Sequence, residues 1–128
     1  MDILVLIGRI LFSAIFIGSG VQHFTRAAMM SPHAGAKGIP APNLMVRLAG
    51  AMVFIGGISV LLGAYARMGA ALLVIFLIPT AIVMHNYWTL SDPVARATDQ
   101  AHFFKDVALA GAALLIWYFG SGPFSLVP

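Results

Sequence analysis

The side chains best suited to chemistry stand where three long apolar stretches of this sequence begin or end. They are Gln22, His23, His85, Asn86, Trp88, Lys105 and Asp106. Amide, indole, imidazole and ammonium groups form hydrogen bonds with polar ring substituents, and histidine also relays protons near neutral pH. These residues are therefore the candidate binding site for a quinone headgroup, a cofactor that suits their chemistry. We assign no catalytic residue from the sequence.

Other chemistries use the same residue types. His23, His85, His102 and Asp106 are of the kinds that ligate metals. Two histidines that face each other across a bundle, such as His23 and His85, could hold a haem. No spacing in the sequence forms a metal motif, so we assign no metal site. The plain alternative is a belt of His, Tyr and Trp at the membrane surface, where these residues are common.

One arginine lies inside the first apolar stretch. On a helix, Arg9 would lie roughly 9 Å beyond Ile3 along the axis. A charge at that depth is costly and marks a functional or structural polar site. The same helical stripe carries Ser13, Phe16, Gly20 and His23. We expect this stripe to face the interior of a helix bundle.

Arg9 has few acidic neighbours on its side of the membrane. Three of the four aspartates fall at the opposite end of the expected helices. The remaining acceptors are Asp2, backbone carbonyls, the Tyr65 hydroxyl, the serines of the C-terminal tail and the terminal carboxylate. We expect Arg9 to tie the first helix to the tail or to the turn at residues 65–67. Snorkelling to headgroups and direct ligand binding are the alternatives, and Arg67 is taken as a second structural polar residue.

The composition indicates a membrane protein. Of the 128 residues, 61% are hydrophobic and 9% are charged, whereas soluble domains average about 25% charged residues. This length allows a single domain, residues 1–128. Its expected partners begin with the lipid bilayer. The net charge of +3 includes no basic stripe, so nucleic acid is excluded as a partner. The absence of cysteine excludes disulfides and thiol chemistry.

Four stretches have about the 20 residues that a helix needs to cross a bilayer. They cover residues 3–24, 44–64, 68–86 and 103–119, and the last is expected to begin at Phe103 or a few residues before it. Since backbone groups in lipid must be paired internally, we expect an all-α membrane protein, a bundle of four transmembrane helices. The first stretch lacks a preceding basic region and is expected to remain as a helix. Residues 25–43 and 87–102 are expected to be loops, the former with a short interfacial helix at its start.

Small residues and one proline indicate where the helices pack or bend. Glycines let membrane helices approach closely. We expect such notches at Gly18, Gly20, Gly50, Gly56 and Gly57. Pro79 lies inside the third stretch and is expected to kink it.

The positive charges predict an orientation. With four spans, both termini share a side with the turn at residues 65–67, and the two long loops share the other side. The loop side carries Arg26, Lys37, Arg47, Arg96 and Lys105. Only Arg67, and Arg9 if it snorkels, belong to the terminal side. The positive-inside rule therefore predicts cytoplasmic loops and external termini.

A series of short motifs in a fixed order runs along nearly the whole chain. They are Gly8-Arg9, Gly20-x-x-His23, Gly38-Ile39-Pro40, Gly56-Gly57, Gly63-x-x-x-Arg67, His85-Asn86, Phe104-Lys105-Asp106 and the tail Gly120-Ser121-Gly122-Pro123-Phe124-Ser125-Leu126. In these motifs the chain resembles the DoxX family of small bacterial membrane proteins. The resemblance implies a four-helix protein of the inner membrane, linked to redox complexes, because the family takes its name from a subunit of a thiosulfate:quinone oxidoreductase. Family members often carry lysine in place of His23 and glutamate in place of Val53, so chemistry specific to those groups is not carried over.

Three functions stay open. The first is a DoxX-like subunit of a quinone-linked membrane redox complex, with a protein partner and with or without catalysis of its own. The alternative is a non-catalytic membrane scaffold or assembly factor. A small transporter formed by homo-oligomers is a weaker alternative, because proton-coupled exporters of this size need a carboxylate inside a span and the sequence offers none there.

Overall fold

The structure is a computed structural model of the chain, and it describes residues 2–127. Its helices are α1 (Asp2–Thr25), α2 (Ala27–Ala36), α3 (Pro42–Leu62), α4 (Ala66–Met84), the short 3₁₀ helix η1 (Tyr87–Thr89) and α5 (Pro93–Phe119). Four helices, α1, α3, α4 and α5, are long and apolar enough to cross a membrane. The prediction of an all-α protein with four such helices is confirmed.

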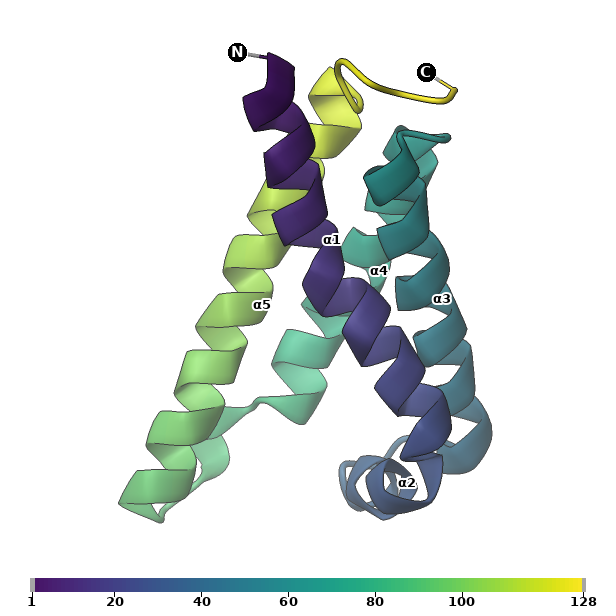
Figure 1. Cartoon of the computed structure of the whole chain (residues 1–128). Coiled ribbons are helices and arrows are strands. Elements are labelled where there is room, and N and C mark those ends of the chain that lie inside the picture. Colours follow the sequence, from purple (N-terminus) through teal and green to yellow (C-terminus); the bar gives the residue numbers. More distant parts are fainter. Residues whose placement is uncertain (1, 128) are drawn as a thin grey trace.

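The helices pack as a chain of neighbours. Helix α1 packs on α3, α3 on α4, and α4 on α5, while the short α2 lies against α3. Both termini and the α3–α4 turn lie at one end of the bundle, and α2 and the α4–α5 connection lie at the other (Figure 1). This is the sharing of sides that the sequence predicts. In Figure 1, α1 and α5 overlap near the terminal end and diverge toward the other end.

One expected boundary was wrong. Helix α5 begins at Pro93, well before Phe103, so much of the expected loop at residues 87–102 is helical. The physical reason is a complete helix start: Asp92 is the N-cap, its Oδ2 accepts a hydrogen bond of 2.9 Å from the N–H of Ala95, and proline stands at the first helical position. Hydropathy alone misses this part of α5 because polar side chains alternate with small ones there and most of them are exposed.

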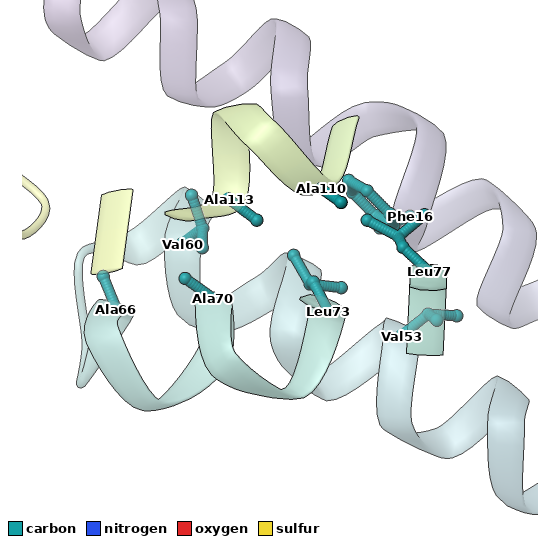
Figure 2. Close-up of a cluster of buried hydrophobic side chains, with 9 residues drawn as sticks. All are labelled: Phe16, Val53, Val60, Ala66, Ala70, Leu73, Leu77, Ala110 and Ala113. Carbon is teal, nitrogen blue, oxygen red and sulfur yellow. The ribbon is translucent and has the colours of Figure 1, made fainter. Parts of the chain in front are cut away.

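The core forms along one stripe of each long helix. On α1 the buried residues are Arg9, Ser13, Phe16, Gly20 and His23, which confirms the stripe predicted from the spacing. Figure 2 shows a cluster of buried side chains contributed by α1, α3, α4 and α5. Most are small or β-branched, so these helices approach closely without large side chains between them. The opposite faces of the helices are apolar and exposed, as lipid contact requires.

Glycines set the closest helix approaches. A Cβ on Gly20 would lie 2.6 Å from the Cβ of Phe54, and a Cβ on Gly50 would lie 2.5 Å from the Cβ of His23. Such separations do not occur between real side chains, so α1 and α3 can cross here only because both positions lack a side chain. Gly18, in contrast, has nothing within 4 Å of its Cβ position and faces outward.

Helix α3 uses two adjacent glycines for two different neighbours. A Cβ on Gly56 would lie 2.9 Å from Leu73 of α4, and a Cβ on Gly57 would lie 3.1 Å from Phe16 of α1. Of the five glycines expected at close helix contacts, all but Gly18 lie at one. Helix α3 therefore makes close contacts with both α1 and α4.

Arg9 binds the C-terminal tail. Its side chain is 5% exposed, and its Nη1 and Nη2 donate five hydrogen bonds of 2.7–3.3 Å. The acceptors are the carbonyl oxygens of Leu61, Ser121, Pro123 and Phe124 and the hydroxyl of Ser125. The tail is one of the two places where partners were expected, whereas Leu61 lies at the end of α3 and not in the turn at residues 65–67. The terminal carboxylate, also considered as a partner, lies outside the described residues.

The same tail caps the end of α3. The last carbonyls of a helix have no partner within the helix. Here the Leu61 carbonyl accepts from Arg9, the Leu62 carbonyl from the N–H of Leu126 at 3.1 Å, and the Gly63 carbonyl from the N–H of Val127 at 3.0 Å. The tail thus joins α1, α3 and the α3–α4 turn into one unit at the terminal end.

Arg67 has a looser position on the same side. It is exposed, and a Cβ on Gly120, whose φ is +81°, would lie 3.4 Å from its Nε. It therefore packs beside the start of the tail, and its role as a structural polar residue remains a prediction.

Gly20→Ala should destabilise the protein and Gly18→Ala should not. Both changes lie in α1 and gain the same helix propensity, but only Gly20 meets another helix. Overpacking of this kind costs roughly 1–3 kcal/mol. The measurement is the thermal unfolding midpoint of each variant in detergent. Equal midpoints for the two alanine variants would show that the α1–α3 crossing tolerates a methyl group.

Arg9→Leu should loosen the tail. Several buried carbonyls would lose their donor, at about 1–3 kcal/mol each, and part of that loss is offset because the buried charge disappears. We expect a lower unfolding midpoint and faster chymotrypsin cleavage at Phe124, which is exposed in the tail. Arg26→Leu is the control, since it removes an exposed cation at the other end of the bundle. A melting curve for Arg9→Leu that overlays the wild-type curve would rule out the structural role.

Candidate functional site

A cavity of about 570 Å³ lies at the loop end of the bundle, where α1 and α5 diverge (Figure 1). All five α-helices contribute to its walls, which are mostly aliphatic, aromatic and methionine side chains. The polar residues of the lining are Ser19, His23, His33, Thr80, His85, Lys105 and Asp106. An apolar chamber with a few convergent polar groups is the usual form of a small-molecule site.

His23 enters the cavity from α1. It lies on the buried stripe of that helix, and Gly50 leaves the space that its Cβ needs. Its side chain is 9% exposed, and its Nδ1 lies 2.7 Å from the carbonyl oxygen of Ser19. A carbonyl only accepts, so Nδ1 carries the proton, and in the neutral ring Nε2 is then an acceptor. The edge-on ring of Phe76, 5.9 Å away, forms the neighbouring wall.

His85 lies between two carboxylates. It caps the C-terminal end of α4, with Nδ1 at 3.4 Å from Oδ1 of Asp99 and Nε2 at 3.7 Å from Oδ2 of Asp106. Its ring stacks on that of His102 at 5.0 Å. These three partners share one face of α5, which is possible because α5 begins early enough to make their segment helical.

Asp106 is the buried charge of the site. Its side chain is 7% exposed. The other charged residues of α5 lie closer to the start of that helix. Its neighbour Lys105 is 43% exposed, with Nζ at 3.8 Å from Oδ1 of Asp106 and at 3.4 Å from Nδ1 of His102. The carboxylate therefore has a lysine and a histidine as neighbours, and neither is at hydrogen-bond distance.

The cavity contains part of the candidate set drawn from the sequence. His23, His85, Lys105 and Asp106 line it. Gln22, Asn86 and Trp88 are not among the lining residues. Gln22 is exposed on the outside of α1. Asn86 accepts a hydrogen bond of 2.5 Å from Lys37, which ties the end of α2 to the end of α4.

Trp88 belongs to a separate aromatic cluster. It packs edge-on against Tyr87 and Phe103, at 5.3 and 5.6 Å between ring centroids. The cation of Arg96 lies 5.9 Å from the centre of the Tyr87 ring. With Trp88 half-exposed, this cluster has the character of an interfacial belt, the plain alternative considered for the whole candidate set.

Sequence reasoning missed the contribution of α2. Met29, Met30 and His33 line the cavity because α2 folds back under the bundle and packs on α3 and the end of α4. The expectation of a short helix after the first span was correct, but nothing in its sequence says where it docks. Ser19 and Thr80 were also missed, since single hydroxyl residues in membrane helices are common.

No metal centre is visible in the described part of the chain. Within residues 2–127, no three His, Asp or Glu side chains are arranged to hold an ion. His23 and His85 both line the cavity, from α1 and α4. The groups that this site offers to a ligand are hydrogen-bonding side chains on an apolar wall.

Comparison with known proteins gives two matches. Residues 4–86 match the family model described as DoxX. The chain is also similar to inner membrane protein YphA of Escherichia coli K12, with 32% identity over 124 residues, which covers 97% of this chain and 88% of the relative. No solved structure matches the chain.

Proposed function

The chain belongs to the DoxX family, and we propose that it is a quinone-binding subunit of a redox complex in the inner membrane. The cavity is the binding site, and His23, His85, Lys105 and Asp106 contact the headgroup. The protein need not catalyse a reaction itself, since a subunit that holds a quinone can serve a partner that carries electrons. The DoxX resemblance supports the link to redox complexes, and the cavity supports the choice of ligand.

The observation that carries this proposal is the pairing of apolar walls with polar groups from different helices. Ring-sized ligands bind in chambers of about 300–1,000 Å³, and this cavity has about 570 Å³. Its polar groups come from α1, α2, α4 and α5, so they can contact opposite edges of a flat ring. Its methionines, from α2, α3 and α4, provide a deformable apolar surface.

The scaffold function remains the alternative, and it predicts that the cavity holds no quinone. The transporter function was disfavoured because the sequence showed no carboxylate inside a span. Asp106, however, is buried well inside α5, so this helix does contain a carboxylate. A transporter still has no observation of its own in its favour.

Purified protein should carry extractable quinone, and His85→Ala should reduce its amount. Loss of a hydrogen bond from the ligand lowers affinity about five- to tenfold. The measurement is quinone per protein in an organic extract, with the melting curve as a check on folding. Gln22→Ala is the matched control, because it changes a polar residue beside His23 that does not line the cavity.

The outcomes separate the two functions. A lower quinone content in His85→Ala than in Gln22→Ala supports the proposal. If wild type and His85→Ala contain equally little quinone, the scaffold function replaces it.

We also propose that the loop end of the bundle faces the cytoplasm. It carries five of the seven basic residues, and the positive-inside rule then sets the orientation. Because the chain has no cysteine, a single introduced thiol reports one position. Gln100→Cys on the loop side should resist a membrane-impermeant maleimide in intact spheroplasts, and Leu126→Cys in the tail should react. The reverse pattern would invert the topology.

A further inference from the structure

We propose that the cavity selects the reduced, dihydroxy form of its ring ligand, a hydroquinone, over the oxidised quinone. This inference rests on the proposed function and adds the redox state of the preferred ligand. It is carried by the donor and acceptor roles of the two most buried polar side chains in the cavity, His23 and Asp106.

His23 presents an acceptor to the cavity. Its Nδ1–H is occupied by the Ser19 carbonyl at 2.7 Å, so a neutral ring has only a lone pair left, on Nε2. Within residues 2–127, Nε2 makes no hydrogen bond, and it is not among the fully buried polar atoms, on a residue that lines the cavity. A ligand hydroxyl can donate to this nitrogen, whereas a ligand carbonyl would face it with a second lone pair.

Asp106 presents acceptors from the opposite wall. Both of its contacts, His85 at 3.7 Å and Lys105 at 3.8 Å, are longer than a hydrogen bond. Its oxygens thus keep their acceptor capacity while the side chain is 7% exposed. A buried carboxylate without a direct donor is costly, and a ligand hydroxyl would supply that donor with a charge-assisted hydrogen bond.

The remaining polar groups do not reverse this preference. Both ring nitrogens of His85 face carboxylates of α5, Nδ1 that of Asp99 and Nε2 that of Asp106. Ser19 and Thr80 have hydroxyls that can donate or accept. Lys105 can donate, but it is 43% exposed and already lies beside His102 and Asp106. His33 of α2 is exposed at the rim. A hydroquinone offers a donor at each end of its ring, and a quinone offers acceptors only.

The test compares three ligands that share one shape. Decylubiquinol, decylubiquinone and the dimethyl ether of decylubiquinol are titrated under anaerobic conditions into the full chain in lipid nanodiscs. The quinol should bind about tenfold more tightly than the quinone, because it forms hydrogen bonds that the quinone cannot form. The ether keeps the ring and tail but has no hydroxyl proton, so it should bind as weakly as the quinone.

Two variants then locate the effect. Asp106→Asn keeps the size of the side chain and replaces an acceptor-only group by an amide that also donates, so the ratio of quinol to quinone affinity should fall several-fold. Asp99→Asn changes another α5 carboxylate that contacts His85 but does not line the cavity, and its ratio should equal that of wild type. An unchanged ratio in Asp106→Asn would overturn the assignment of Asp106 as the acceptor.

The failures of the two proposals are distinct. Equal affinity for quinol and quinone, tighter binding of the quinone, or an ether that binds like the quinol each overturns the selectivity and leaves the binding function standing. Absence of binding by all three ligands overturns the binding function itself. If Asp106→Asn does not fold, the comparison of the three ligands on wild-type protein still decides the matter.

Discussion

The guanidinium of Arg9 must find its hydrogen-bond partners within the protein, because the hydrocarbon around α1 offers none. Its partners are four neutral backbone carbonyls, which would otherwise be short of donors, and one hydroxyl. The tail has to pass over the end of the bundle to present them, and this path also brings it to the last carbonyls of α3. One buried cation therefore determines the course of the tail and completes the cap of a second helix.

The same face of α1 serves a different purpose at its other end. From Arg9 it continues through Phe16, in the centre of the core, and Gly20, at the crossing with α3, to His23 in the cavity. The crossing fixes the position of α1 against α3 and so fixes where the imidazole stands. The terminal end and the cavity end of the bundle are thus linked by one helix whose buried side cannot shift without disturbing both.

The sequence predicted those features that depend on helical periodicity or on eliminating the possible partners of a side chain. The 3.6-residue rhythm predicted the buried face of α1, and the scarcity of acids near Arg9 pointed to carbonyl and hydroxyl partners. Hydropathy failed at the start of α5, because the cap formed by Asp92 and Pro93 begins a helix that is polar for its first turns. The α2 wall could not be foreseen, since its docking depends on tertiary contacts with Val46 and Met84 that leave no local pattern. For the same reason the sequence placed Gln22 and Trp88 in one candidate site with His23 and His85, although neither of them lines the cavity.

The rim of the cavity has a consequence for how a ligand would be held. Ile15, Met29 and Met45, which help line it, are 41, 70 and 42% exposed, so part of its exposed edge is apolar. Beyond α1 such an edge meets acyl chains, and a headgroup could slide in sideways while its isoprenoid tail stays dissolved in the bilayer. The protein would then recognise a ring and ignore the chain attached to it. Homologous compounds that differ only in tail length would compete on equal terms, according to how much of each the membrane contains.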